Sequence, residues 1–148
     1  MEIREEVLNE AELIKHEGGE IPEIAFWNSY YWLTDQPPKG MGLKLNEKEM
    51  MILKEAVIER YLTIIKRDLT YENFGKPFFR GIERATINLN RLKKYLKKEN
   101  LKIKYPEIKK QIKEWFDTLL KILKSKNEEF LLSNEQKEKF IKELEGSL

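Results

Sequence analysis

Apolar residues recur every three to four positions along most of this 148-residue chain, and no stretch alternates strictly between apolar and polar residues. This period is typical of amphipathic helices, whereas a half-buried strand alternates with a period of two. Proline, glycine and capping residues separate the periodic stretches. The pattern therefore predicts an all-α fold, an irregular compact bundle of five to six helices. The helices are expected at about residues 2–16, 22–33, 47–67, 77–99 and 106–126, with a short sixth after Ser133.

The segment after Asn46 has the clearest helix start. Asn46 can cap the helix, and Glu49, three residues on, completes a pattern like the capping box, in which each side chain bonds the other residue's backbone N–H. Apolar residues then cover about half of the helix circumference, so we expect this helix to lie centrally in the bundle. The helix expected at 77–99 carries only a narrow apolar seam, which predicts a position at the edge.

Length and composition fit one domain, residues 1–148. The chain is 41% hydrophobic, enough for a single core, and neither half has enough apolar residues to fold alone. The absence of cysteine excludes disulfides, thiolate metal sites and cysteine nucleophiles. The N-terminus is acidic and no apolar run approaches the roughly 20 residues that cross a bilayer, so we expect a soluble cytoplasmic protein without a secretory signal or membrane segment. Frequent lysine and glutamate give a thermophile-like composition.

The net charge of +2 hides a strong separation of charge along the chain. Residues 1–35 contain nine acidic and two basic residues, a net charge of −7. Residues 91–126 contain four acidic and thirteen basic residues, a net charge of +9. A basic segment of this kind suits nucleic acid or another polyanionic partner. The alternative is that the acidic ends of the chain fold against the basic middle and neutralise it.

Aromatic residues are concentrated in one expected helix. Five of the seven residues from Phe26 to Trp32 are aromatic, namely Phe26, Trp27, Tyr30, Tyr31 and Trp32. Helical spacing spreads them over more than one face, which is costly in water, so the segment either seeds the core or forms a contact surface. Tryptophan and tyrosine dominate binding hot spots. The functional interpretation is therefore a surface for a protein partner or for a second copy in a homo-oligomer, with the proline- and glycine-rich loop that follows as its rim.

Cationic side chains form a strip on the helix expected at 77–99, opposite its apolar seam. The residues of this candidate site are Arg80, Arg84, Arg91, Tyr95 and Lys98. Cations in a row can follow phosphates while a tyrosine stacks on a base, as in the binding of single-stranded nucleic acid. Three alternatives stay open. The strip is a solvated face, a protein partner binds its arginines, or Arg80 and Arg84 form internal ion pairs with Asp68 and Glu72.

No complete catalytic or metal-binding motif is present. His16 is the only histidine, which argues against a zinc site and suggests a side chain that interacts with the end of its helix. No nucleophile elbow and no phosphate-binding glycine loop occurs. We therefore expect no metal, no cofactor and no enzymatic activity. The least favoured hypothesis is an enzyme whose site uses Asp68, Glu72, Arg80 and Arg84.

The sequence thus predicts a small helical protein that binds another protein or its own copy through the aromatic segment, without catalysis. Nucleic-acid binding through the basic strip is the alternative function. No motif in the chain is specific enough to carry over the activity of a known family.

Overall fold

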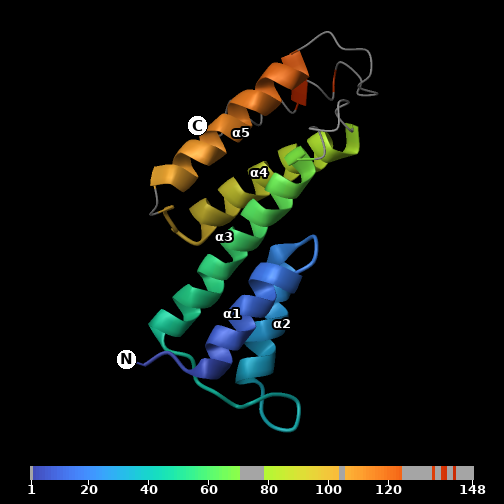
Figure 1. Ribbon diagram of the computed structural model, residues 1–148. Helices are drawn as coiled ribbons and strands as arrows, with labels where there is room; N and C mark the ends of the chain where they lie inside the picture. The colour runs from blue at the N-terminus through green and yellow to red at the C-terminus, as the bar shows by residue number, and fades with distance from the viewer. Residues whose placement is uncertain are drawn as a thin grey trace. The chain divides into compact units, whose positions relative to one another are not determined.

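The computed structural model describes residues 2–70, 79–103 and 106–124, together with positions 135, 138, 139 and 142. These residues form helices and loops, without a strand among them (Figure 1). The helices are α1 (Glu5–Glu17), α2 (Pro22–Thr34), α3 (Glu47–Thr70), α4 (Phe79–Lys98) and α5 (Pro106–Lys124). The all-α prediction is confirmed, while the helix expected after Ser133 lies almost entirely outside the described residues. No helix within these ranges is long and apolar enough to cross a membrane.

The chain divides into two compact units, Met1–Ile64 and Ile65–Leu148, and the division falls inside α3. The first unit contains α1, α2 and most of α3, and the second contains the end of α3 with α4 and α5. The expectation of one domain stays a prediction. α3 continues to Thr70, past the break expected at Asp68, and the Asp68 side chain is buried.

The core of the first unit follows the apolar spacing of its helices. On α1, the buried residues Val7, Ala11 and Ile14 lie four and three positions apart, as expected for one helix face. α2 lies beside α1 and returns in the opposite direction (Figure 1). The buried apolar residues of α2 and of the part of α3 in this unit are Pro22, Phe26, Leu33, Leu53, Ala56, Val57, Ile58, Tyr61 and Ile64.

Glycines make the sharp connection between α1 and α2. Gly18 follows the end of α1, and a Cβ there would lie 2.4 Å from the backbone oxygen of Ile14. Gly19 has a φ of +71°, a left-handed conformation that glycine adopts without a steric penalty. The helix end predicted at these two residues is confirmed, and it allows α2 to start within a few residues of α1.

Polar bonds fasten α3 to the α1–α2 pair within the first unit. The guanidinium of Arg60 donates hydrogen bonds to the backbone oxygens of Gly19 (3.1 Å) and His16 (3.3 Å). The buried Tyr61 donates its hydroxyl proton to the carboxylate of Glu23 on α2. The two bonds from Arg60 satisfy carbonyl groups at and just after the end of α1, which lack partners within their own helix, and the Tyr61 bond ties α3 to α2.

The loop between α2 and α3 folds back over the end of α2. The backbone N–H of Met41 donates to the oxygen of Trp32, and that of Leu43 donates to the oxygen of Leu33, both at 2.8 Å. Gly42, with a φ of +65°, donates its backbone N–H to the oxygen of Asp35. The last carbonyl groups of α2 are thereby satisfied, so this helix end is fixed in place.

In the second unit, α4 and α5 pack as a helical pair. Ala85, Leu89 and Leu92 of α4 are buried as the seam predicted, and Phe116 and Leu119 of α5 are buried too. The prediction of a peripheral α4 with a narrow seam needs correction. The buried residues of this helix also include the polar side chains of Thr86, Asn88 and Asn90, so α4 is covered well beyond its leucines. Because these buried residues are polar, the pattern of apolar residues along the sequence underestimates the width of the buried face.

Candidate functional site

The two faces of α2 differ in burial although both are rich in apolar residues. The inner face consists of Pro22, Phe26, Ser29 and Leu33, all buried. The outer face exposes Ile24, Trp27 and Tyr31, which follow one another at intervals of three and four residues and so form a strip along the helix. Their side chains are 54%, 49% and 51% exposed, and Trp32 beside them is 49% exposed. We call Ile24, Trp27, Tyr31 and Trp32 the aromatic face.

The rings of α2 contact one another in a continuous series. The ring centroids of Trp27 and Tyr31 lie 5.8 Å apart in a stacked arrangement, with 28° between their planes. Trp27 also meets Phe26 (5.1 Å) and Tyr30 (5.6 Å) edge to face. Such pairs hold the rings in defined positions. Within the predicted segment, Phe26 lies in the core, Tyr30 is half-buried and Trp27, Tyr31 and Trp32 lie at the surface, so the core role is confirmed for Phe26 and the role as a contact surface stays a prediction.

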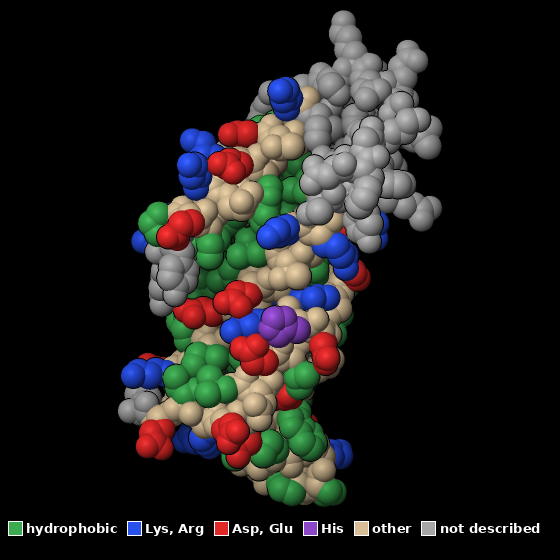
Figure 2. Space-filling view, viewed as in Figure 1, with side chains coloured by type: hydrophobic (Ala, Val, Ile, Leu, Met, Phe, Trp, Pro, Cys, Tyr) green, Lys and Arg blue, Asp and Glu red, His purple; other side chains and the backbone are tan. Residues whose placement is uncertain are grey.

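The aromatic face carries no charge of its own. Glu23 is the only charged residue within α2, and it accepts the hydroxyl proton of Tyr61. Asn28 is the one polar residue between the exposed rings. Hydrophobic side chains accordingly reach the surface over α2 and the loop that follows it (Figure 2). A contiguous apolar surface on a folded unit is typical of a binding site.

Sequence reasoning missed part of this surface. Ile24 and Ile21 are 54% and 41% exposed, and Met41 of the following loop is 36% exposed. None of the three is aromatic, so the search for rings passed over them. The near absence of charged residues in α2 would have indicated these positions. A helix that is hydrophobic on all sides is normally covered on all sides, so any uncovered side exposes apolar residues.

On α4, three cations of the predicted nucleic-acid site lie on one exposed face of the helix. Arg84, Arg91 and Lys98 are exposed on one face, and Lys94 lies among them at helical spacing. The side chain of Arg80 lies outside the described residues. Tyr95 does not flank the strip as a free ring, because its side chain is buried and only 7% exposed. The strip therefore offers cations without the stacking group that the nucleic-acid hypothesis assigned to it.

We call Arg91, Lys94 and Lys98 the basic strip. None of the three forms an ion pair with a residue in the described part of the chain. Burial lowers the pKa of the neighbouring Lys93, and the charge of Lys97 lowers that pKa further. On α5, by contrast, basic and acidic side chains are intermixed at the surface (Figure 2). Among the described residues, Arg91, Lys94 and Lys98 therefore form a row of exposed cations on one face of α4.

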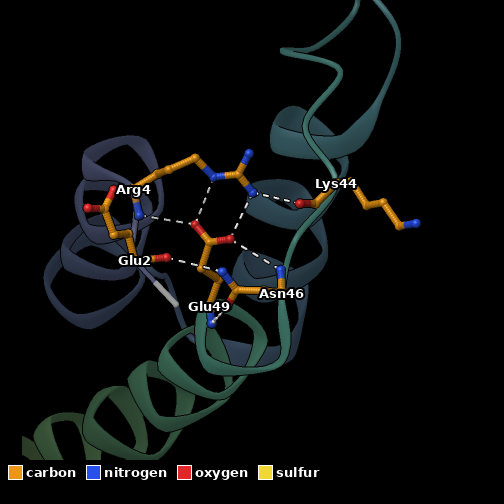
Figure 3. Close-up of polar contacts among 5 residues, drawn as sticks. All are labelled: Glu2, Arg4, Lys44, Asn46 and Glu49. Atoms are coloured by element: carbon orange, nitrogen blue, oxygen red, sulfur yellow. Dashed lines mark hydrogen bonds and ion pairs between the residues drawn. The ribbon is translucent and has the colours of Figure 1, made fainter.

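A buried carboxylate at the start of α3 is held by the N-terminal segment (Figure 3). Glu49 is fully buried and accepts hydrogen bonds from Arg4 through the backbone N (3.1 Å), Nε (3.0 Å) and Nη2 (2.8 Å). The predicted capping box is also present, since Asn46 N donates to Glu49 Oε1 at 3.2 Å and Glu49 N donates to Asn46 Oδ1 at 2.9 Å. Bonds from Arg4 lower the pKa of Glu49 to about 2. Both carboxylate oxygens are occupied, so this group stabilises the fold.

The other candidate groups do not assemble into a reaction centre within the described residues. His16 is exposed among acidic side chains (Figure 2), and its Nε2 lies 3.1 Å from Glu12 Oε2. Asp68 is buried with its Oδ1 3.4 Å from Nη2 of Arg67. Glu72 and the side chain of Arg80, which complete the enzyme hypothesis and the internal ion-pair alternative, lie outside the described residues. Within the part described, no group of three or more metal-ligating side chains comes together.

Comparison with known proteins adds a family. A search of curated proteins and a search of solved structures each gave no match. A family model described as a repeat of unknown function (DUF7826) matches residues 3–144, which include all five helices. The match covers nearly the whole chain, and the chain therefore belongs to the DUF7826 family of repeats.

Proposed function

We propose that this chain is a self-assembly module that acts by binding rather than by catalysis, and that the aromatic face of α2 is the surface that contacts a second copy. The observation that carries the proposal is the half-exposed, uncharged strip formed by Ile24, Trp27 and Tyr31 on a helix whose opposite face is already buried in the core. Tryptophan and tyrosine in such a position bury much apolar area on contact at a low cost in side-chain entropy.

The fixed geometry of the surface supports this role. Trp27 is held by edge contacts with Phe26 and Tyr30, and Phe26 is anchored in the core. The loop after α2 is tied to the end of the helix by the backbone bonds of Met41 and Leu43. A surface that is already ordered loses little conformational entropy when it binds, so more of its contact energy becomes affinity.

Membership of a repeat family supports a second copy as the partner. Structural repeats bury their exposed hydrophobic faces by stacking on neighbouring copies. In this chain α2 carries a face of this kind, because Ile24, Trp27 and Tyr31 are about half exposed. The module is therefore expected to cover the aromatic face with another copy of itself.

Size-exclusion chromatography with light scattering tests the proposal. The double variant Trp27→Ser/Tyr31→Ser is expected to elute as a 17.8 kDa monomer at concentrations at which the unchanged chain is larger. Leu13→Ser is the matched control, because Leu13 is 47% exposed but belongs to α1 and not to the aromatic face. An unchanged mass for the double variant, or an equal loss with the control, would contradict the proposal.

A second candidate function is the binding of single-stranded nucleic acid through the exposed cations of α4, which are Arg84 and the basic strip. It is favoured by the row of exposed cations on α4, which neutralises phosphates without needing base contacts. Fluorescence anisotropy with a labelled oligonucleotide at low salt tests it. Binding that weakens steeply with added salt and is reduced by Arg84→Ala/Arg91→Ala would support this function, and the absence of binding at low salt would exclude it.

A further inference from the structure

We infer that two copies of this chain meet head to tail, with the aromatic face of one copy packed on the basic strip of the next. This inference rests on the proposed function and names the surface that the aromatic face contacts. The alternative assembly is symmetric, with two aromatic faces in contact. Four features of the molecule favour the head-to-tail arrangement.

The first feature is the matching length of the two surfaces. Ile24, Trp27 and Tyr31 lie at positions i, i+3 and i+7 of α2, and Arg91, Lys94 and Lys98 have the same spacing on α4. Seven residues of α-helix rise about 10 Å, so each surface is a strip of about two turns. Two helices can therefore place one strip along the other with every member facing a partner.

The second feature is the chemistry of the facing groups. The exposed faces of tryptophan and tyrosine attract ammonium and guanidinium groups, and this attraction increases when water is excluded. Trp27 and Tyr31 stack on each other with 28° between their planes and are about half exposed, so each ring keeps surface that a cation can contact. Arg91, Lys94 and Lys98 supply the cations, together with long aliphatic stems that pack on apolar side chains.

The third feature is the net charge of the chain segment that contains each surface. Residues 1–35, which contain α1 and α2, have a net charge of −7, and residues 91–126 have a net charge of +9. A symmetric contact would bring two copies of the acidic segment 1–35 close together, and their repulsion disfavours that arrangement. A head-to-tail contact brings opposite charges together. Asp35, exposed at the end of α2 and in line with Tyr31 and Ile24, is placed to meet a lysine at the end of the strip.

The fourth feature is the geometry that repeats require. A head-to-tail contact uses two different surfaces on each copy, so every copy that joins leaves one surface for the next. This is the arrangement by which repeat proteins extend into arrays. A symmetric contact consumes the same surface on both copies and ends at a dimer. Membership of a repeat family therefore agrees with the head-to-tail contact.

A mixing experiment separates the two arrangements. The first protein is Trp27→Ser/Tyr31→Ser, which loses the aromatic face and keeps the basic strip. The second is Arg91→Glu/Lys94→Glu, which loses the strip and keeps the aromatic face.

All four positions are exposed, so both proteins are expected to fold, and circular dichroism checks their helix content. Should the glutamate protein lose helix, Arg91→Gln/Lys94→Gln replaces it. Lys109→Glu/Lys113→Glu on α5 is the control for a change of charge elsewhere.

The inference predicts that each variant alone has the mass of the 17.8 kDa monomer and that an equimolar mixture gives a species of twice that mass in analytical ultracentrifugation. The control on α5 should assemble like the unchanged chain. If Arg91→Glu/Lys94→Glu assembles alone while the aromatic variant does not, the contact is symmetric, and the inference is wrong although the proposed function stands. If both variants assemble alone, or if the unchanged chain stays monomeric, the proposed function itself is wrong.

Discussion

The outer faces of α2 and α4 present the same spacing with opposite chemistry. On α4, the exposed residues Arg91, Lys94 and Lys98 are all cationic, which is usual for a helix face in water. On α2, the residues at the same spacing are Ile24, Trp27 and Tyr31, and they are about half exposed. Water solvates the cationic face of α4 well. Covering the apolar face of α2 removes apolar surface from water, which is favourable. This difference is why α2, rather than α4, is proposed as the surface that needs an apolar cover.

The strongest consequence of this contrast lies within α2. Leu33→Ala is expected to lower the free energy of unfolding by about 3 kcal/mol, because it opens a cavity in the core. Trp27→Ala removes a larger side chain, yet in dilute protein it should lower the free energy of unfolding by less than about 1 kcal/mol. The reason is that Trp27 is already about half exposed to water. Urea unfolding followed by circular dichroism measures both. A larger loss for Trp27→Ala would show that the ring belongs to the core.

The buried ion pair anchors the unit that carries the aromatic face. Glu49→Gln is expected to lower the free energy of unfolding by about 2 kcal/mol, because the neutral amide cannot pair with the Arg4 guanidinium and places an N–H₂ group where a donor is already present. The matched control is Glu47→Gln, an exposed residue in the same first turn of α3. The control should change the stability by less than about 0.5 kcal/mol. Equal effects of the two substitutions would show that Glu49 acts only through the charge of the helix start.

The same carboxylate gives the fold a sensitivity to acid. The pKa of Glu49 is lowered to about 2 from an ordinary value of 4.5, so its charged form is stabilised in the folded state. The stabilisation is complete above pH 4.5 and is lost as the pH falls toward about 2. Thermal unfolding of the unchanged chain and of Glu49→Gln at several pH values should give midpoints that converge over this window. A constant difference between the two proteins down to pH 2 would contradict the assignment.

The smallest effect on stability is expected on the outer face of α4. Arg91→Ala/Lys94→Ala should change the free energy of unfolding by less than about 0.5 kcal/mol, because both side chains are exposed and form no ion pair within the described residues. Chemical denaturation in dilute protein measures the change. A loss above about 2 kcal/mol would mean that the strip is part of the fold rather than a free surface.

Most of the correct predictions came from patterns among residues close together in the sequence. The capping box of Asn46 and Glu49 was predicted because it depends on residues three positions apart. Arg4 also binds Glu49, but it lies 45 positions away in the sequence, and no local pattern predicts this contact. A pairing between distant residues depends on how the helices pack, and a helical period alone does not contain that information.

The candidate surfaces show the same limit. Helical spacing placed Phe26 and Trp27 on different faces, but only the packing of α2 on α1 decides that Phe26 is buried and Trp27 exposed. Tyr95 was expected beside the cations of α4, whereas the buried face of this helix is wide enough to include it. Thr86 and Asn88 are part of that wide face, and as polar residues they did not enter the hydrophobic pattern.

Sedimentation equilibrium of the unchanged chain, over a range of protein concentrations at low and at high salt, examines the proposed assembly most directly. The head-to-tail contact predicts a mass above 17.8 kDa that rises with protein concentration and falls as salt screens the attraction between acidic and basic surfaces. A mass that stays high or increases with salt would indicate a symmetric apolar contact. A mass of 17.8 kDa under every condition would contradict self-assembly altogether.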